Sequence, residues 1–269
     1  MQYEPIKRSL GRVLSGSLFM RKTLYFLLDL LLLRTWHVKK ALRKISGQFP
    51  GNASVLDAGS GFGQYTWRMS KMNRKWNIKA TDINNEQVDD CNMFFRKTGL
   101  SDRVTFHTED LTSLSDLDCY NVILSVDVME HIEEDVLVFR NFYNSLKEDG
   151  ILLISTPSDK GGSDVHSDDE ESFIDEHVRN GYSITGITEK LARAGFRNIE
   201  ASYTYGKPGN ISWRLSMKYP VKMLNTSYLF FILLPFYYLI FFPVSVVLNY
   251  FDLTLTHKTG TGLIVTARK

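Results

Sequence analysis

The chain has 269 residues, 43% of them hydrophobic, which is enough for one large α/β domain or two small ones. The net charge of +2 is uneven: residues 1–46 hold ten Lys or Arg against two acids, about +8, leaving about −6 for the remainder. This basic start indicates an anionic partner, either a membrane or a nucleic acid. With only Cys91 and Cys119, the chain has no recognisable disulfide framework and no cysteine-based zinc site, which suits a reducing compartment.

The first 46 residues are predicted to form basic amphiphilic helices. Residues 17–33 are largely apolar, and the basic residues within or beside them are Arg21, Lys22, Arg34, Lys39 and Lys40. Such a segment is typical of a helix that lies in a membrane interface. A helix that covers the apolar core of its own domain has a similar composition, so both interpretations stay open.

From residue 53 onward, short β-rich runs alternate with helical stretches. Strands are predicted at 54–59, 76–83, 103–110, 120–128, 150–157, 197–206 and 261–269, with helices at 64–72, 86–99, 133–150 and 184–196. This alternation implies right-handed βαβ crossovers and a mostly parallel, doubly wound α/β sheet. Between the fifth strand and the last of these helices, the polar segment 157–180, with seven acids between Asp164 and Glu176, is either a solvated loop or a lid over a site.

The stretch VLDAGSGFG, residues 55–63, ends the first strand and leads into a helix. Gly59, Gly61 and Gly63 permit positive φ and close approach of a ligand to backbone N–H groups at the helix start. The spacing is not the G-x-G-x-x-G of dinucleotide sites, because Gln64 stands where the last glycine would fall. Asp57 beside the turn would repel a pyrophosphate and suits the ammonium group of an amino acid.

Together with later segments, this turn resembles the class I S-adenosylmethionine-dependent methyltransferases, of the type 11 kind. Asp82 ends the second strand 25 residues after Asp57, and Glu109-Asp110-Leu111 ends the third. Residues 125–131, SVDVMEH, follow the fourth strand and resemble the family's D-V-x-E-H stretch. The resemblance covers roughly residues 50–206 and 260–269.

The resemblance implies a Rossmann-like, seven-stranded, mostly parallel sheet with an antiparallel last strand, and S-adenosyl-L-methionine as cofactor. Asp82 would accept hydrogen bonds from the ribose hydroxyls, an acid at 109–110 would meet the adenine amino group, and Val126 would offer its backbone. The implied cofactor-binding residues are Asp57, Gly59, Ser60, Gly61, Gly63, Asp82, Ile83, Glu109, Asp110, Leu111, Ser125 and Val126.

Methyl transfer from a sulfonium mainly requires that the acceptor be positioned, and a base is needed only when the acceptor must lose a proton. His131 and His177 are the candidate catalytic residues. His131 equally suits packing against the helix that follows it. Asp127, Glu130 and His131 also resemble a magnesium-binding group of some quinone O-methyltransferases, but no metal is expected.

Residues 223–251 contain no charge and include fifteen Leu, Ile, Val or Phe between Leu229 and Leu248. On an insertion scale these favour the bilayer by up to about 5–9 kcal/mol. One crossing is not expected, because the block lies between the last two strands, which pair in one sheet. Pro235 and Pro243 can break a helix, which predicts a re-entrant or interfacial helical hairpin. A buried dimer interface or substrate-tunnel wall is the alternative.

We therefore expect helices at 1–46, a methyltransferase domain at 47–206 and 259–269, and a membrane-associating insertion at 207–258. The expected function is methyl transfer to a hydrophobic or lipid acceptor (a lipid, an isoprenoid quinone precursor or a similar compound) at a membrane surface. The protein is expected to be cytoplasmic and peripheral or monotopic on the inner face of the cell membrane. The alternatives are a soluble small-molecule methyltransferase whose insertion forms a dimer, and a non-catalytic protein that binds the cofactor and docks a partner. No nucleic-acid partner is expected, and the oligomeric state stays open.

Overall fold

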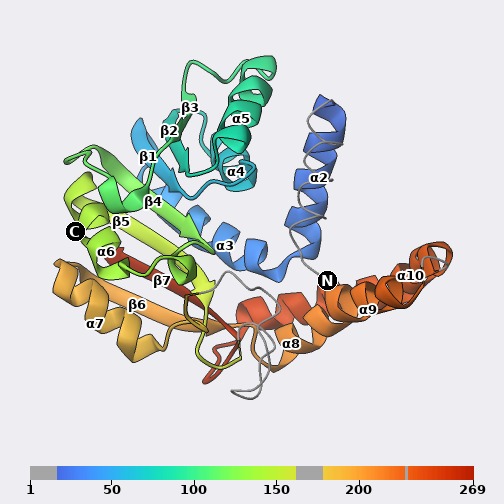
Figure 1. Cartoon of the computed structure of the whole chain (residues 1–269). Coiled ribbons are helices and arrows are strands. Elements are labelled where there is room, and N and C mark those ends of the chain that lie inside the picture. Colours follow the sequence, from blue (N-terminus) through green and yellow to red (C-terminus); the bar gives the residue numbers. More distant parts are fainter. Residues whose placement is uncertain (1–16, 162–177, 228–229) are drawn as a thin grey trace.

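The computed structural model describes residues 17–161, 178–227 and 230–269. Its centre is one seven-stranded sheet in the order β3-β2-β1-β4-β5-β7-β6 (Figure 1). The strands are β1 Ala53–Ala58, β2 Trp76–Asp82, β3 Val104–Thr108, β4 Tyr120–Val126, β5 Leu146–Pro157, β6 Arg197–Thr204 and β7 Gly262–Arg268. Strands β1 to β5 pair in parallel, and β7 runs antiparallel between β5 and β6. The expected fold class is thus confirmed, including the antiparallel last strand.

Helices cover both faces of this sheet. They are α2 Leu18–Leu31, α3 Leu33–Gln48, α4 Gln64–Met72, α5 Asn85–Lys97, α6 Asp135–Ser145 and α7 Ile184–Ala194, with short 3-10 turns η1 Leu111–Ser113 and η2 Met129–His131. Helices α3, α4 and α5 pack on one face through a core that includes Val38, Leu42 and Phe95. Helices α6 and α7 pack on the other.

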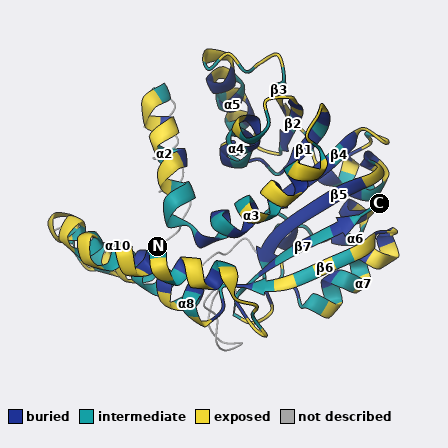
Figure 2. Ribbon diagram, turned by 180° about the vertical axis from the view of Figure 1, so that it is seen from behind, coloured by how far each residue is buried: buried dark blue, intermediate teal, exposed yellow. Residues whose placement is uncertain are grey.

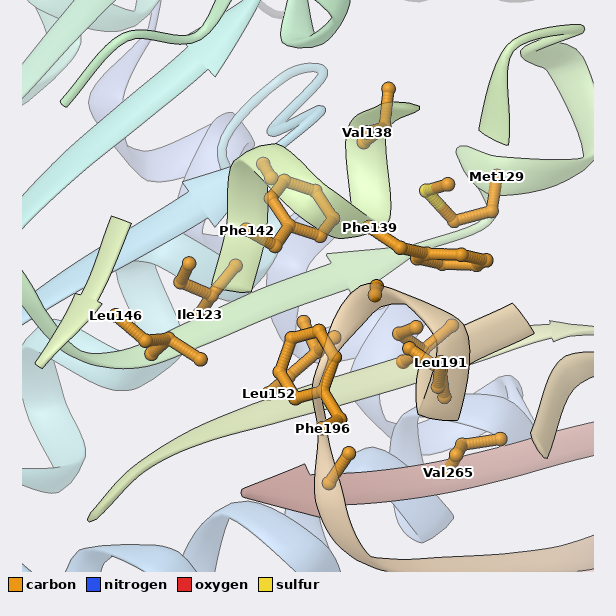
Figure 3. Close-up of a cluster of buried hydrophobic side chains, with 14 of the residues drawn as sticks. Ile123, Met129, Val138, Phe139, Phe142, Leu146, Leu152, Leu191, Phe196 and Val265 are labelled. Carbon is orange, nitrogen blue, oxygen red and sulfur yellow. The ribbon is translucent and has the colours of Figure 1, made fainter. Parts of the chain in front are cut away.

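The second core shows why the central strands are apolar on both faces. Phe139 and Phe142 of α6 and Leu191 of α7 meet Ile123 and Leu152 of the sheet (Figure 3). Ile123 and Leu152 are fully buried, as are their sheet neighbours Leu124 and Leu153, which face the opposite helices. A strand with helices on both faces needs a continuous apolar run rather than an alternating one.

The helix expected at 133–150 is wrong at its C-terminal end. Helix α6 ends at Ser145, and residues from Leu146 onward already belong to β5. Leu146 is fully buried and pairs with Tyr120, and the pairing shifts register before Val122. Burial of Leu146 in the sheet therefore overrides the helical propensity of the polar residues that follow it.

The insertion forms a long helical arm, which comprises residues 207–254. It consists of α8 Lys207–Trp213, the π-turn η3 Arg214–Lys218, α9 Tyr219–Thr226 and α10 Phe230–Thr254. Ser212 Oγ donates to the Ser245 carbonyl, and Tyr237 OH donates to that of Leu215, so α10 runs antiparallel to the outgoing helices. The arm projects away from the sheet (Figure 1).

The expected hairpin within 223–251 is corrected in one respect. Residues 230–254 form a single continuous helix, with Pro235 and Pro243 inside it, and the preceding helix α9 ends at Thr226. The neighbouring helices α8 and α9 hold α10 along its length, which explains why two helix-breaking residues do not end it. The hairpin is therefore made by α10 together with the less apolar residues before it.

Proline also explains the π-turn on the outgoing side. Pro220 has no N–H, so it cannot donate a hydrogen bond to the Ser216 carbonyl. The Tyr219 amide donates to the Arg214 carbonyl rather than to that of Leu215. The carbonyls of Leu215 and Ser216 are thereby left without their usual helical donors. Tyr237 OH and Tyr238 OH of α10 donate to these two carbonyls, each at 2.8 Å.

Candidate active site at the carboxyl edge of the sheet

The glycine turn after β1 has the conformation that its sequence predicts. Gly59, Gly61 and Gly63 have φ values of 77°, 51° and 81°. A Cβ on Gly59 would lie 2.2 Å from Val128, and one on Gly63 would lie 3.1 Å from Phe106, so protein atoms fill the space beside both. Beside Gly61 the nearest atom is Gln87 Oε1 at 3.8 Å. Gly61 is therefore the glycine of this turn at which a Cβ would meet no close contact.

Asp82 connects the second strand to this turn. Its Oδ2 accepts a 2.8 Å hydrogen bond from the Gly61 amide, and its Oδ1 accepts one of 2.9 Å from the Asn84 amide. Each carboxylate oxygen retains a further lone pair, and the side chain is half-buried. Asp82 is thus oriented by two backbone donors and can still accept hydrogen bonds from a diol. Ile83 beside it is 76% exposed, an apolar surface next to the carboxylate.

The acidic pair after β3 divides between two environments. Glu109 forms an ion pair with Lys79 at 2.9 Å, and its amide donates to the Asp82 carbonyl. Asp110 is exposed and caps η1 by accepting from the Thr112 amide at 2.8 Å, while Leu111 is buried. Lys79 already holds the Glu109 carboxylate, so Asp110 presents the more accessible acceptor.

Three buried hydroxyls at this edge, those of Ser60, Thr81 and Ser125, have no hydrogen-bond partner among the described residues. Thr81 and Ser125 pair in register with Ala58 on either side of β1, and the Val126 residue that follows Ser125 is half-buried. Buried hydroxyls without partners are uncommon in folded proteins. Together with Asp82, Ile83 and the uncrowded side of Gly61, they form a candidate site that suits a nucleoside carrying an amino-acid moiety.

Asp57 lies below the turn and is 2% exposed. Burial is the main cause that raises the pKa of the Asp57 carboxyl to about 7, and the negative charge of Asp82 raises this pKa further. The Thr66 hydroxyl donates a hydrogen bond of 2.5 Å to the carboxyl, which lowers the pKa and so opposes the rise. A cation placed near Asp57 would stabilise the ionised form. The expected interaction with an ammonium group is consistent with this environment.

The N-terminal helices contact the turn directly. Arg21 is 3% exposed, and its guanidinium donates to the Phe62 carbonyl at 2.8 Å and pairs with Asp90. The Tyr25 hydroxyl also donates to the Phe62 carbonyl. Asp29 accepts from Gln64 at 3.0 Å and pairs with Arg68. Arg21, which the sequence suggested as a basic flank for a membrane, thus points inward, whereas Lys22 is exposed.

Arg34, like Arg21, contacts its own domain. It was expected to flank an interfacial helix, but its guanidinium pairs with Asp127 after β4, and its backbone amide donates to Tyr205 OH at 2.8 Å. Its buried Nε has no partner among the described residues. Asp127 has a φ of 51° and its amide donates to the Ser155 carbonyl. Contacts between segments 93 and 171 residues apart left no signal in the sequence.

The candidate catalytic histidines remain predictions. His131 is half-buried at the end of η2, and His177 lies outside the described residues. The neighbouring Glu130 is 1% exposed and accepts from the Thr156 hydroxyl at 3.1 Å, and burial raises its pKa. Within the described parts of the chain, no group of three or more acids, histidines or cysteines is placed to hold a metal ion.

The sheet edge thus brings the cofactor-binding candidates from β1, β2, β3 and β4 together. A family of methyltransferase domains matches residues 51–195, more than half of the chain. The chain belongs to the methyltransferase domain family. This membership confirms the enzyme class and S-adenosyl-L-methionine as the cofactor of the site, while the roles of the individual residues stay predictions.

Two curated relatives, both malonyl-[acyl-carrier protein] O-methyltransferases, match part of this chain. The malonyl-[acyl-carrier protein] O-methyltransferase of Bacillus cereus is 28% identical over 130 residues, which are 48% of this chain and 47% of that protein. The chain spans about half the length of the curated relatives it matches.

Solved structures agree on the fold. Phosphoethanolamine N-methyltransferase 2 of Haemonchus contortus, in complex with S-adenosyl-L-methionine, has a TM-score of 0.60 and 17% identity, covering 81% of this chain and 49% of that one. A putative sarcosine dimethylglycine methyltransferase of Galdieria sulphuraria has a TM-score of 0.58 and 16% identity, covering 88% and 84%. At such identities the likeness concerns the fold alone.

Proposed function

We propose that this methyltransferase transfers a methyl group from S-adenosyl-L-methionine to a lipid-soluble acceptor at a membrane surface. The observation that carries the proposal is the polarity of α10, which is reversed relative to a helix of a water-soluble domain. Its buried residues are Ser245, Asn249 and Asp252, all polar, whereas Leu239 is 76% exposed and Ile232 is 68% exposed. Water disfavours this arrangement, and a bilayer favours it.

The seam between α8 and α10 has the composition of a helix pair in a membrane. The outgoing helices contribute Gly209, Ser212 and Ser216 to it, each buried. A Cβ on Gly209 would lie 2.6 Å from both Asp252 Oδ1 and Leu33, so only glycine permits this approach. Small and polar residues at the contact, with apolar residues on the outside, are typical of helices that associate in lipid.

A single crossing is inconsistent with the topology. Among the described helices, α10 is long and apolar enough to span a bilayer, but its C-terminal end returns to β7, which pairs with β5 and β6. Both ends of the arm therefore lie on the same side. This arrangement supports a peripheral or monotopic location, and we propose the cytoplasmic face of the cell membrane.

Helix α2 adds a second apolar surface near the same site. Phe19 is 78% exposed and Phe26 is 64% exposed, while Arg21 and Tyr25 of this helix hold the Phe62 carbonyl beside the glycine turn. Figure 2 shows the exposed side of α2 and that of the arm, and Figure 1 shows both leaving the domain near the start of α3. Membrane contact through both would bring the acceptor to the sheet edge without a passage through water.

Arg34 favours one chemical class among lipid-soluble acceptors, namely an acyl carboxylate. Its buried Nε has no partner among the described residues, and the guanidinium is half-buried beside Asp127. A guanidinium is the side chain best shaped for a carboxylate. A carboxylate is already ionised at neutral pH, so its oxygen needs no general base to accept the methyl group. The Bacillus relative is named for O-methylation of a malonyl group, which agrees with this class.

The first experiment incubates the purified protein with radiolabelled S-adenosyl-L-methionine and a detergent-dispersed membrane-lipid extract. Label in the organic phase that Asp82→Ala abolishes would support the proposal. An absence of organic-phase label, with intact cofactor binding by the wild-type protein, would contradict a lipid acceptor in that extract. Hexadecanoic acid in place of the extract tests the carboxylate class, with Arg34→Gln as variant and the exposed Arg193→Gln as its control.

A further inference from the structure

The outgoing side of the arm carries a row of basic residues on the face opposite α10. The buried positions on this side are Ser212, Ser216 and Pro220. A basic residue stands two positions after each of them, namely Arg214, Lys218 and Lys222. Two residues correspond to about 200° around a helix, so the basic row points away from the seam. The segment 207–251 contains no Asp or Glu, and its charged residues are Lys207 and the three residues of the basic row.

The arm is therefore layered. The free face of α10 is apolar, the seam is small and polar, and the far face of α8, η3 and α9 carries the positive charge. Ile232, Leu239 and Tyr250 lie along one line on α10, because 7 and 18 residues correspond to nearly whole numbers of turns. These three side chains are 68%, 76% and 60% exposed, so the apolar face extends over most of the helix.

We propose that the arm lies in the plane of the membrane, with α10 at the acyl boundary and the basic row at the level of anionic headgroups. This inference rests on the membrane docking proposed above and defines its chemistry. Packed helices lie about 8–10 Å apart, and interfacial helices sink about 5–10 Å below the headgroups. With α10 at that depth, α8 and α9 lie among the headgroups, where Arg214, Lys218 and Lys222 meet lipid phosphates.

Perpendicular insertion is disfavoured by the same charges. The 20 residues of 207–226 rise about 30 Å, so Lys218 would lie roughly 16 Å deep, near the middle of the hydrocarbon layer. A basic residue near the centre strongly disfavours insertion, and Arg214 and Lys222, about one turn to either side of Lys218, add to that cost, so together they offset much of what the apolar residues of α10 gain. The in-plane orientation keeps the apolar gain and adds attraction to the headgroups.

The first test measures binding of the full-length protein to vesicles of phosphatidylcholine, alone or mixed with phosphatidylglycerol. Each basic residue near an anionic surface contributes about fivefold to the partition coefficient. The triple variant Arg214→Gln/Lys218→Gln/Lys222→Gln should bind the mixed vesicles about 100-fold more weakly. It should bind neutral vesicles like the wild type, and added salt should reduce the wild-type preference.

The matched control removes three exposed charges from the methyltransferase domain, as Lys75→Gln/Lys97→Gln/Arg193→Gln, and should bind mixed vesicles like the wild type. Equal wild-type binding to both vesicle types, or an equal loss in the control, would overturn the role of the basic row. Methyl transfer to detergent-dispersed lipid would then still stand, since that assay does not depend on headgroup charge. The inference would also be overturned if the protein did not bind vesicles and sedimented as a dimer formed through the arm.

The second test measures depth. Nitroxide labels are attached singly at Ile232→Cys, Leu239→Cys and Tyr250→Cys in a Cys119→Ser background, which removes the exposed native thiol. The collision rate of each label with oxygen is compared with its collision rate with a nickel chelate. This ratio should place all three labels at a similar depth below the phosphates. The 18 residues between the outer labels span about 27 Å, so a gradient of that order would overturn the in-plane orientation.

Discussion

The sheet edge and the arm distribute polarity in opposite ways. At the sheet edge, apolar residues such as Leu56 and Ile123 are buried, and Asp82 and Asp110 reach the surface. In the arm, Ser245, Asn249 and Asp252 are buried, and Leu239 and Ile232 are exposed. This contrast is what leads us to propose that the arm meets a bilayer while the sheet edge meets water. The difference shows that the exposed class of side chain, rather than overall composition, indicates which solvent a surface meets.

Asp252 is the residue on which the two regions depend most, because it joins them. Its carboxylate is fully buried and accepts from His37 at 2.9 Å, from the Gly209 amide at 3.0 Å and from the Tyr205 amide at 3.1 Å. Asp252→Ala leaves these donors unpaired, and we expect a loss of about 3–5 kcal/mol in the free energy of unfolding. Denaturant titration measures it. Asp252→Asn should retain part of the stability, and the exposed Asp102→Ala should retain all of it; an unchanged Asp252→Ala would contradict the anchoring role.

Loss of Asp82 should affect the sheet edge alone. Removing a carboxylate that can accept two hydrogen bonds from a diol should weaken S-adenosyl-L-methionine binding at least about 100-fold. Isothermal titration calorimetry measures this, with the exposed helical Asp89→Ala as control. Vesicle binding by Asp82→Ala should stay at the wild-type value. Cofactor affinity within about threefold of wild type would remove Asp82 from the site.

The tyrosine pair of α10 tests the seam of the arm. Tyr237→Phe removes the hydroxyl that donates to the Leu215 carbonyl, and Tyr238→Phe removes the one that donates to the Ser216 carbonyl. Both carbonyls lack their usual helical donor beside Pro220. We expect about 1 kcal/mol of lost local stability for each, measured as faster amide exchange in α8 and α9. Tyr250→Phe, at a hydroxyl on the 60% exposed Tyr250, is the control. Exchange that is no faster in either variant than in the control would mean that the seam does not depend on these bonds.

An effect of similarly small size concerns the pH dependence at Asp57. Because the folded pKa of about 7 exceeds the ordinary carboxyl pKa of 3.8, protonation stabilises the cofactor-free protein at low pH, and this stabilisation is lost as pH rises through 7. A bound ammonium favours the ionised carboxylate, so affinity for S-adenosyl-L-methionine should rise about five- to tenfold from pH 6 to pH 7.5. Asp57→Asn should flatten this slope in calorimetry. An identical slope in wild type and variant would assign the titration to another group.

The fold class could be predicted from the sequence alone, and so could the position of the cofactor candidates together at one edge of the sheet. Strand and helix patterns have short periods, and the glycine turn and Asp82 each lie at a strand end, where parallel topology brings them to one edge. Local rules suffice for such features, and the cofactor candidates of four strands indeed share that edge. The same local rules failed where burial in the sheet moved the start of β5 to Leu146.

Only the tertiary structure decided which charges face inward and how the apolar block is paired. Arg21 and Arg34 lie within or beside an apolar segment, as basic residues that flank a membrane helix do. In the structure Arg21 pairs with Asp90 and Arg34 pairs with Asp127, and both acids are distant in sequence. The apolar block gave no indication that its partner would be the basic segment before it, because helix pairing depends on Gly209, Ser212 and Asp252 meeting at one seam. Such contacts depend on where the chain returns in space, which no short-range pattern records.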